Sequence, residues 1–337
     1  MLNSVYSRYL ILLSLSIQSI ASQTQPRNTG VPLVGVLMQP PSESLNNIVR
    51  SATTTHTYVP ESYIQQISNA GGQAVLVSFD LPVLLLYKVL DQLDMFLFPG
   101  GPADLISGDG EVTPFQQSAH DIIEWAKKRN DEGRYFPIFA TCLGMEAMMI
   151  SVAGNNISIL QGGFANAFKN RTLTVDATEF ASSKLYSNVD QKTFEDFGSE
   201  GLAYYNHNYA VFKSYFLKNP MLKSSFRIVC TTKFDRIREE FVACIEHRKY
   251  PFLANQWHPE KYQNEKGTYY TFIERSSRYM KMLNQLLMKM VDSVRGSSKP
   301  LSKMSPIVKQ FLTSSHTPIQ TAFTASERVY LLPRFMP

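Results

Sequence analysis

Short apolar runs that alternate with helical patterns are the feature that most restricts how this chain can fold. Apolar runs typical of strands buried on both faces occur at residues 33–37, 73–77, 94–98 and 135–140. Helical patterns separate them, at residues 58–69, 83–93 and 116–128. Because strands and helices alternate with short connections, the pattern predicts βαβ units and a parallel sheet.

The fourth apolar run leads into Cys142, at an expected turn from strand to helix. Such a turn lifts one side chain above the sheet and places it beside the helix N-terminus, whose dipole and free N–H groups favour an anion. For a thiol this setting lowers the pKa and stabilises the thiolate, so Cys142 is a candidate nucleophile. The alternative is a buried structural cysteine, because free cysteines are among the most buried residues. This stretch alone leaves both interpretations open.

Gly100 and Gly101 follow the third apolar run. Two glycines at the carboxyl end of a parallel strand allow backbone N–H groups to approach a ligand closely. The alternative is an ordinary turn. The alternation of elements places this pair on the same rim of the sheet as Cys142.

His258 ends a further expected strand, on the same rim. A cysteine nucleophile needs a base that forms the thiolate and a donor for the leaving amine, and histidine does both near neutral pH. Glu260 can fix the tautomer of the imidazole and stabilise the imidazolium. The N–H of Leu143 and one N–H from Gly100 or Gly101 are candidate donors to the oxyanion of a tetrahedral intermediate.

Other functions find less support in the sequence. G-x-S-x-G, H-E-x-x-H, P-loop and paired C-x-x-C motifs are absent, which argues against serine hydrolases, zincins, nucleotide-binding proteins and zinc fingers. The formal net charge of +5 is concentrated in residues 295–337, whereas residues 22–294 are close to neutral. This distribution argues against a nucleic-acid-binding surface. We expect the basic tail to be solvated or draped over the surface.

Residues 1–21 have the pattern of a secretory signal peptide. An arginine precedes an apolar core, and Ser19 and Ala21 stand at the −3 and −1 positions of a cleavage site. The apolar core is too short for a membrane-spanning helix, which needs about 20 residues. Sequons at Asn156 and Asn170 are compatible with export.

The remaining cysteines lie in two segments, 226–233 and 240–247, that we expect to pair as a hairpin. This pairing puts Cys230 roughly opposite Cys244. In an oxidising compartment the two could form a cross-strand disulfide or remain two buried thiols. In either case Cys142 is the unpaired cysteine.

Three motifs in this order carry a resemblance to a known family. They are Phe98-Pro99-Gly100-Gly101, Thr141-Cys142-Leu143-Gly144 and Gln256-Trp257-His258-Pro259-Glu260-Lys261. Together they resemble the class I glutamine amidotransferase-like domains, and most closely the γ-glutamyl hydrolase family. Three further stretches also fit that family: Gly35-Val36-Leu37-Met38-Gln39, Thr141 to Glu146, and Asn206-His207-Asn208-Tyr209. The resemblance covers about residues 32–290.

The resemblance implies a flavodoxin-like three-layer α/β sandwich with a mostly parallel central sheet, at residues 32–294, followed by the tail at 295–337. It makes Cys142 the nucleophile and His258 its base. The remaining carried-over site residues are a second histidine and two pocket residues: His207, Glu146 and Tyr58. Ala140 stands where the family usually has Gly, and we expect the turn to survive because Ala is also small.

The implied reaction is hydrolysis of folate poly-γ-glutamates through a γ-glutamyl thioester on Cys142. The resemblance also implies no metal or organic cofactor, a homodimer, and residence outside the cell or in a lysosome or vacuole. The charge distribution and the short apolar core argue against nucleic-acid and membrane partners. It does not extend to the pairing of Cys230 with Cys244, nor to how far this branch depends on Glu260.

Two other functions fit the same scaffold. A glutaminase would pass ammonia to a synthetase, but no synthetase domain accompanies this domain and the chain carries a signal-like N-terminus. A non-catalytic protein that binds γ-glutamyl ligands would not need the set formed by Cys142, His258 and Glu260. An activity assay separates these alternatives from the hydrolase.

Overall fold

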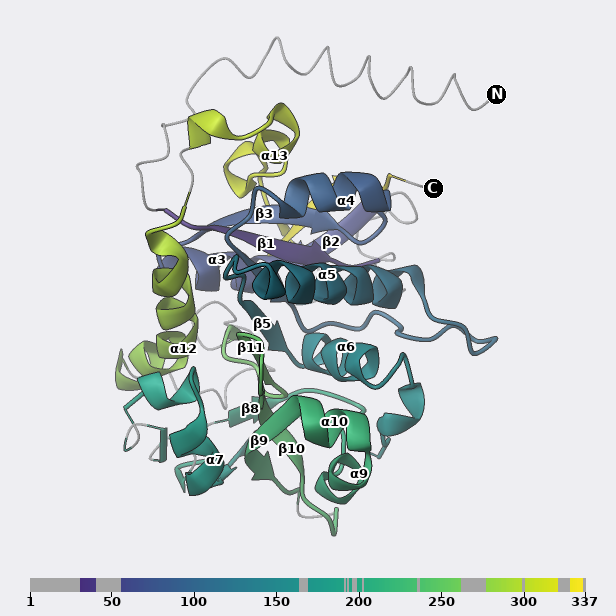
Figure 1. Cartoon of the computed structure of the whole chain (residues 1–337), viewed down its shortest axis with the longest axis vertical. Helices are drawn as coiled ribbons and strands as arrows, with labels where there is room; N and C mark the ends of the chain where they lie inside the picture. The colour runs from purple at the N-terminus through teal and green to yellow at the C-terminus, as the bar shows by residue number, and fades with distance from the viewer. Residues whose placement is uncertain are drawn as a thin grey trace.

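The computed structural model describes residues 31–40, 56–163, 169–190, 203–234, 237–261, 277–298, 301–320 and 328–335, with a few positions between 192 and 201. Figure 1 shows the chain as a layered α/β structure. The expected signal peptide at residues 1–21 lies outside the described residues. No helix within the described ranges combines the length and apolar character needed to cross a membrane.

The main sheet of the described residues has eight strands in the order β3-β1-β4-β5-β11-β10-β9-β7. In that order the strands are Gln73–Ser78, Leu33–Met38, Met95–Phe98, Ile138–Thr141, Phe252–Asn255, Phe241–His247, Phe226–Thr232 and Thr174–Val175. All neighbours from β3 to β11 pair parallel, and β10, β9 and β7 extend the sheet antiparallel. The predicted central, mostly parallel sheet is confirmed.

Helices cover both faces of this sheet. The chain moves from β1 to β3 in one direction across the sheet and then from β3 to β4 and β5 in the other. Because βαβ crossovers are right-handed, this reversal puts α3 (Glu61–Asn69) on one face and α4 (Val83–Leu90) and α5 (Pro114–Asp131) on the other. Helix α12 (Ser277–Arg295) contacts α3, and α6 (Leu143–Val152) contacts α5, which completes three layers (Figure 1).

The first expected helix differs from the structure at its beginning. Residues 58–60 belong to a strand, β2 (His56–Pro60), and the helix begins only at Glu61. Strand β2 pairs with β13 (Arg328–Pro333), which pairs in turn with β12 (Ile319–Gln320), all antiparallel. The partner of β2 comes from the far end of the chain, and so no local pattern indicated a strand there.

The basic tail is also more than the solvated or draped segment that we expected. Helix α13 (Pro306–Gln310) and the residues after it bury Val308 and Leu312 completely. The N–H of Leu76, in β3, donates to the carbonyl of Phe311 at 2.7 Å. The segment from α13 to Leu312 therefore packs onto the edge of the main sheet.

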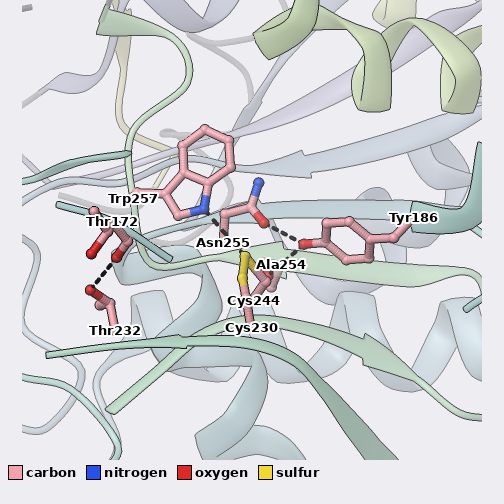
Figure 2. The surroundings of a disulfide bond; sticks show 8 residues. All are labelled: Thr172, Tyr186, Cys230, Thr232, Cys244, Ala254, Asn255 and Trp257. Atoms are coloured by element: carbon pink, nitrogen blue, oxygen red, sulfur yellow. Dashed lines mark hydrogen bonds between the residues drawn. A yellow bond between two sulfur atoms is a disulfide. The ribbon is translucent and has the colours of Figure 1, made fainter. Parts of the chain in front are cut away.

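The hairpin of β9 and β10 forms as predicted, and Cys230 faces Cys244 in its register. The two form a disulfide, the first of the two alternatives left open by the sequence. Figure 2 shows the indole of Trp257 next to this bond, and its N–H donates to Sγ of Cys244 at 3.3 Å. Tyr186 donates from its hydroxyl to Oδ1 of Asn255, at the end of β11 (Figure 2). The disulfide thus lies beside β11, the strand that leads to His258.

Further described strands and helices follow α6 along the chain. They are β6 (Lys169–Arg171), which pairs with β8 (Ala203–Tyr205), and the short helices α7 (Ala177–Ser182), α9 (Lys213–Lys218) and α10 (Pro220–Ser225). Among the sequons, Asn156 is exposed, and its side chain accepts from the N–H of Ser158. Asn170 lies in β6.

Candidate active site

Cys142 lies between β5 and α6, at the turn that the sequence predicted. Its φ is 51°, in the left-handed region that non-glycine residues seldom occupy. Such a backbone conformation costs on the order of 1–3 kcal/mol. The N–H of Cys142 donates to the carbonyl of Asn255 at 2.7 Å, which ties the turn to β11. Helix α6 can lie close to the sheet because Gly144 has no side chain. A Cβ there would lie 2.5 Å from the carbonyl oxygen of Phe98. The turn therefore depends on a glycine two residues after the thiol.

The thiol of Cys142 is buried. Sγ donates to the carbonyl of Asn206 at 3.7 Å and accepts from Nε2 of Gln256 at 3.8 Å. Burial, and then the charges of Glu146 and Glu260, raise the pKa of this thiol well above its usual value. The expected lowering of the pKa is therefore wrong for this resting structure: the N–H of Leu143 does favour the thiolate, but burial outweighs it. Cys142 rests as a neutral thiol.

His258 and Glu260 lie together just after β11. Nδ1 of His258 is 2.7 Å from a carboxylate oxygen of Glu260, and both side chains are buried. Burial alone would raise the pKa of Glu260, but the charge and hydrogen bond of His258 outweigh it and the pKa is lowered. A carboxylate at Nδ1 keeps the proton there, which leaves Nε2 as the basic nitrogen. Within the described ranges Nε2 is buried without a hydrogen-bond partner.

Gly100 shows how closely these groups converge. A Cβ on Gly100 would lie 2.8 Å from Cε1 of His258, 3.1 Å from Cβ of Cys142 and 2.7 Å from the hydroxyl of Tyr63. The structure thus brings Cys142, His258, Glu260 and the glycine pair to one place, as expected for the rim of a parallel sheet. The roles that we assign to them remain predictions.

The candidate oxyanion donors differ in their present partners. The N–H of Gly100 already donates to the hydroxyl of Tyr63 at 2.7 Å. The N–H of Leu143 interacts with the sulfur of Cys142. For Gly101, no acceptor is found among the residues that the structure describes. Of the three N–H groups, that of Gly101 is therefore the one without a partner among the described residues, whereas that of Leu143 lies at the sulfur itself.

Glu146 lies in the first turn of α6 and is buried beside the thiol. Nε2 of Gln256 donates to its Oε1 at 2.9 Å. Burial raises the pKa of Glu146 to about 8, although the hydrogen bond from Gln256 acts in the opposite direction. Below that pH the group is a neutral acid, so it adds no negative charge next to Cys142.

His207 follows Asn206, whose carbonyl accepts from the thiol. Its Nδ1 lies 2.7 Å from the carbonyl of Tyr209, and aromatic rings surround it: Tyr205, Phe234 and Phe241. Burial lowers the pKa of His207 to about 3, with a smaller contribution from the charge of His258. His207 is thus a neutral, packed histidine near the site.

Tyr58 lies in β2, where it packs with Val329 and Leu331. Its expected place in the pocket remains a prediction. Tyr63, five residues later, is the tyrosine that contacts Gly100. Sequence reasoning did not single out Tyr63, because nothing distinguishes it from the other apolar-side residues of its helix. Gln39, Asn206 and Gln256 stood inside the family motifs, but their contacts needed the fold.

In the described part of the chain no group of three or more His, Cys, Asp or Glu side chains is arranged to hold a metal ion. The groups that converge at the site are a buried thiol, an imidazole and carboxyl groups.

The mostly parallel sheet between helices, with a strained cysteine at the turn from β5 to α6, is the α/β architecture that the resemblance to class I glutamine amidotransferase-like domains implied. Residues 32–260 match the model of the Peptidase C26 family, and the chain belongs to this family. It is accordingly a hydrolase.

Proteins named as γ-glutamyl hydrolases are similar to this chain across plants and mammals. The probable gamma-glutamyl hydrolase 3 of Arabidopsis thaliana is 26% identical, over 76% of this chain and 71% of its own length. The mouse gamma-glutamyl hydrolase is 29% identical, over 75% of each. The human protein of that name is 27% identical, over 68% of this chain and 67% of its own length. The resemblance indicated by the motifs is confirmed.

A solved structure from Thermoplasma acidophilum, described as part of a putative GMP synthase, aligns with 78% of this chain and 96% of its own, at a TM-score of 0.45 and 13% identity. That likeness is too distant to bear on the site.

Proposed function

We propose that this protein hydrolyses γ-glutamyl bonds of folate poly-γ-glutamates, with Cys142 as nucleophile and His258 as general base and acid. The observation that carries the proposal is the convergence of the Cys142 thiol, the His258–Glu260 pair and Gly100. The similarity to proteins named γ-glutamyl hydrolases supports the γ-glutamyl bond as the target. The folate part of the substrate rests on the family resemblance.

In the first half of the reaction, Sγ of Cys142 attacks the γ-carbonyl carbon and its proton passes to Nε2 of His258. Because the resting thiol is neutral, this transfer accompanies the attack rather than preceding it. The carbonyl oxygen becomes an oxyanion, for which the N–H groups of Gly101 and Leu143 are the candidate donors. The C–N bond then breaks, His258 protonates the leaving amine, and a γ-glutamyl thioester remains on Cys142.

In the second half, water attacks the thioester carbonyl and gives its proton to His258. The C–S bond breaks, the γ-carboxyl group of the product leaves, and the thiol regains its proton. Glu260 supports both halves, because its carboxylate stabilises the imidazolium that forms each time and keeps Nε2 directed to the reaction.

Three further groups would contact the substrate. Glu146, beside the thiol, and His207, next to Asn206, are both neutral, so either could donate or accept a hydrogen bond to the γ-glutamyl group. Tyr58, in β2, would contact the more distant parts of a long substrate.

We also propose that the protein passes through the secretory route to the cell exterior, a lysosome or a vacuole, and forms a homodimer. The Cys230–Cys244 disulfide and the exposed Asn156 support an oxidising, glycosylating compartment. The dimer rests on the resemblance, and its mass in light scattering tests it.

The deciding experiment is glutamate release from a γ-linked folate polyglutamate by the purified protein without residues 1–21, beside Cys142→Ala and with glutamine as a competing substrate. We expect hydrolysis of the γ-peptide and none in the variant. Turnover of glutamine alone would instead place the protein among the amidases. If a folded protein turned over neither substrate, the scaffold would be a binding protein.

A further inference from the structure

Gln39 directly follows strand β1 and is completely buried beside the glycine pair. Its Nε2 donates to the carbonyl oxygen of Gly100 at 2.8 Å. A Cβ on Gly101 would overlap Oε1 of Gln39, so the amide packs directly against the backbone of the loop. Gln39 therefore touches the loop that holds one of the two expected oxyanion donors.

The bond from Gln39 determines where the N–H of Gly101 points. The carbonyl of Gly100 and the N–H of Gly101 belong to the same peptide group, and the described chain has no cis peptide bond. In a planar trans peptide the C=O and N–H point in opposite directions. When Gln39 holds the carbonyl on its own side, the N–H of Gly101 must point to the other side of the loop.

The preceding peptide group is fixed as well. The N–H of Gly100 donates to the hydroxyl of Tyr63 at 2.7 Å. The loop is thus held at two successive peptide groups, by one side chain from the end of β1 and one from α3. The N–H of Gly101 is then the loop donor that remains available, in a loop whose Gly100 lies against Cys142 and His258.

Gln39 is itself firmly placed. Its N–H donates to the carbonyl of Tyr58 at 2.8 Å, and its carbonyl accepts from the N–H of Tyr58 at 2.9 Å. The orientation of the amide follows from chemistry, because the carbonyl of Gly100 can only accept and so requires the NH₂ group of Gln39. The opposite orientation would set two oxygens against each other.

We propose that Gln39 is a positioning residue that aims the N–H of Gly101 at the oxyanion of the tetrahedral intermediate. The inference rests on the proposed cysteine hydrolase function. Its energetic consequence is confined to the transition state, because the oxygen carries a full charge only after attack. Gln39 would therefore influence kcat and have little effect on KM.

The test compares Gln39→Met, which keeps the size and removes the donor, with Gln39→Glu and wild type on the γ-linked substrate. Asn130→Leu is the matched control, since Nδ2 of Asn130 also donates to backbone carbonyls, those of Ala126 and Phe136, near the opposite end of β5. Two thiol reagents distinguish an effect on the oxyanion donor from an effect on the Cys142 thiol itself. A γ-glutamyl chloromethyl ketone forms an oxyanion when Cys142 attacks its carbonyl. With iodoacetamide, the sulfur of Cys142 displaces iodide from carbon and no oxyanion forms.

For Gln39→Met we expect kcat to fall by about 10- to 100-fold with KM within about threefold, since one oxyanion donor is worth about 100- to 1,000-fold. Inactivation by the chloromethyl ketone should slow by a similar factor and iodoacetamide alkylation should not. Gln39→Glu should recover activity as the pH falls, because a protonated carboxyl can again donate to Gly100. Asn130→Leu should lower the melting temperature and leave kcat near wild type.

Wild-type kcat in Gln39→Met, equal slowing of both reagents, or a Gln39→Glu variant without acid rescue would overturn the inference. The proposed function would stand in each of these cases, since wild type would still release glutamate. A wild-type protein that released no glutamate would overturn both.

Discussion

The imidazole of His258 donates from Nδ1 to the carboxylate of Glu260, 2.7 Å away, and both groups are buried next to a neutral thiol. The carboxylate of Glu260 holds a full negative charge in the interior, which is costly to bury without a partner, and the N–H of His258 supplies that partner. The carboxylate also fixes the tautomer that leaves Nε2 basic.

We predict that Glu260→Gln lowers kcat by at least about 100-fold while the protein remains folded. An amide oxygen can still accept from Nδ1, but it cannot stabilise the imidazolium that forms during attack. Steady-state kinetics on the γ-linked substrate measure the loss. Glu246→Gln is the control, because Glu246 is also buried but accepts from the backbone N–H groups of Lys184 and Leu185, away from the thiol. Equal losses in the two variants would contradict the role of Glu260.

Glu146 predicts an upper limit to the active pH range. Its pKa is raised to about 8 by burial, so it is neutral below that pH and becomes a carboxylate above it. The new charge raises the pKa of the Cys142 thiol further and opposes thiolate formation. We expect wild-type kcat/KM to fall above about pH 8 and Glu146→Gln to retain activity there. Identical alkaline limbs in both proteins would refute this account.

His207 and His247 predict a loss of stability in acid. Burial lowers the pKa of His207 to about 3 and that of His247 to about 4. Below about pH 6.5 the unfolded chain binds protons at these positions and the folded chain does not, so stability falls as the pH drops from about 6.5 towards those values. Melting temperatures measured from pH 7 to pH 4 should therefore decline.

The decline should be smaller in His207→Gln than in wild type, since glutamine keeps a polar group without titrating. If the melting temperature of His207→Gln fell with pH as steeply as that of wild type, groups other than His207 would account for the decline.

The disulfide predicts the number of reactive thiols. The denatured, unreduced protein should show one free thiol, that of Cys142, and three after reduction, because Cys230 and Cys244 are bonded to each other. The double variant Cys230→Ala/Cys244→Ala should lose about 3 kcal/mol of stability, the value for a loop of this length. Three thiols before reduction would show that the pair is not bonded.

Gly100 should not tolerate substitution by a residue with a side chain. A methyl group there would lie 2.7 Å from the hydroxyl of Tyr63 and 2.8 Å from Cε1 of His258. Neither neighbour can move without disturbing the base or the loop. We expect Gly100→Ala to lose nearly all activity, as measured by glutamate release. The exposed Gly108, where an added Cβ meets nothing within 4 Å, is the control.

The sequence predicted the parts of the fold that depend on neighbours in the chain. Apolar strands, their helices and the elbow at Cys142 are local patterns, and the β9–β10 hairpin needed only two segments close in sequence. The motifs also grouped Cys142, His258 and Glu260, since the rim of a parallel sheet collects the residues that end its strands.

The structural predictions that failed concern segments whose conformation depends on partners distant in the sequence. Tyr58 has a helical spacing with the residues after it, and only its pairing with Leu331 makes it a strand. The tail has a basic composition, and its buried Leu312 is recognisable only beside β3. The raised pKa of Cys142 was missed because a helix N-terminus is visible in a sequence, whereas the depth of burial is not.

The pairing of β13 with β2 has a consequence for synthesis on the ribosome. The hydroxyl of Thr57 donates to the carbonyl of Leu332, 275 positions later. At about 5–20 residues per second, strand β2 waits roughly 15 to 55 s for this partner to be translated. Since Tyr58 in β2 holds the backbone of Gln39, we expect the nascent chain to fix the contact of Gln39 with the glycine pair only after β13 has emerged.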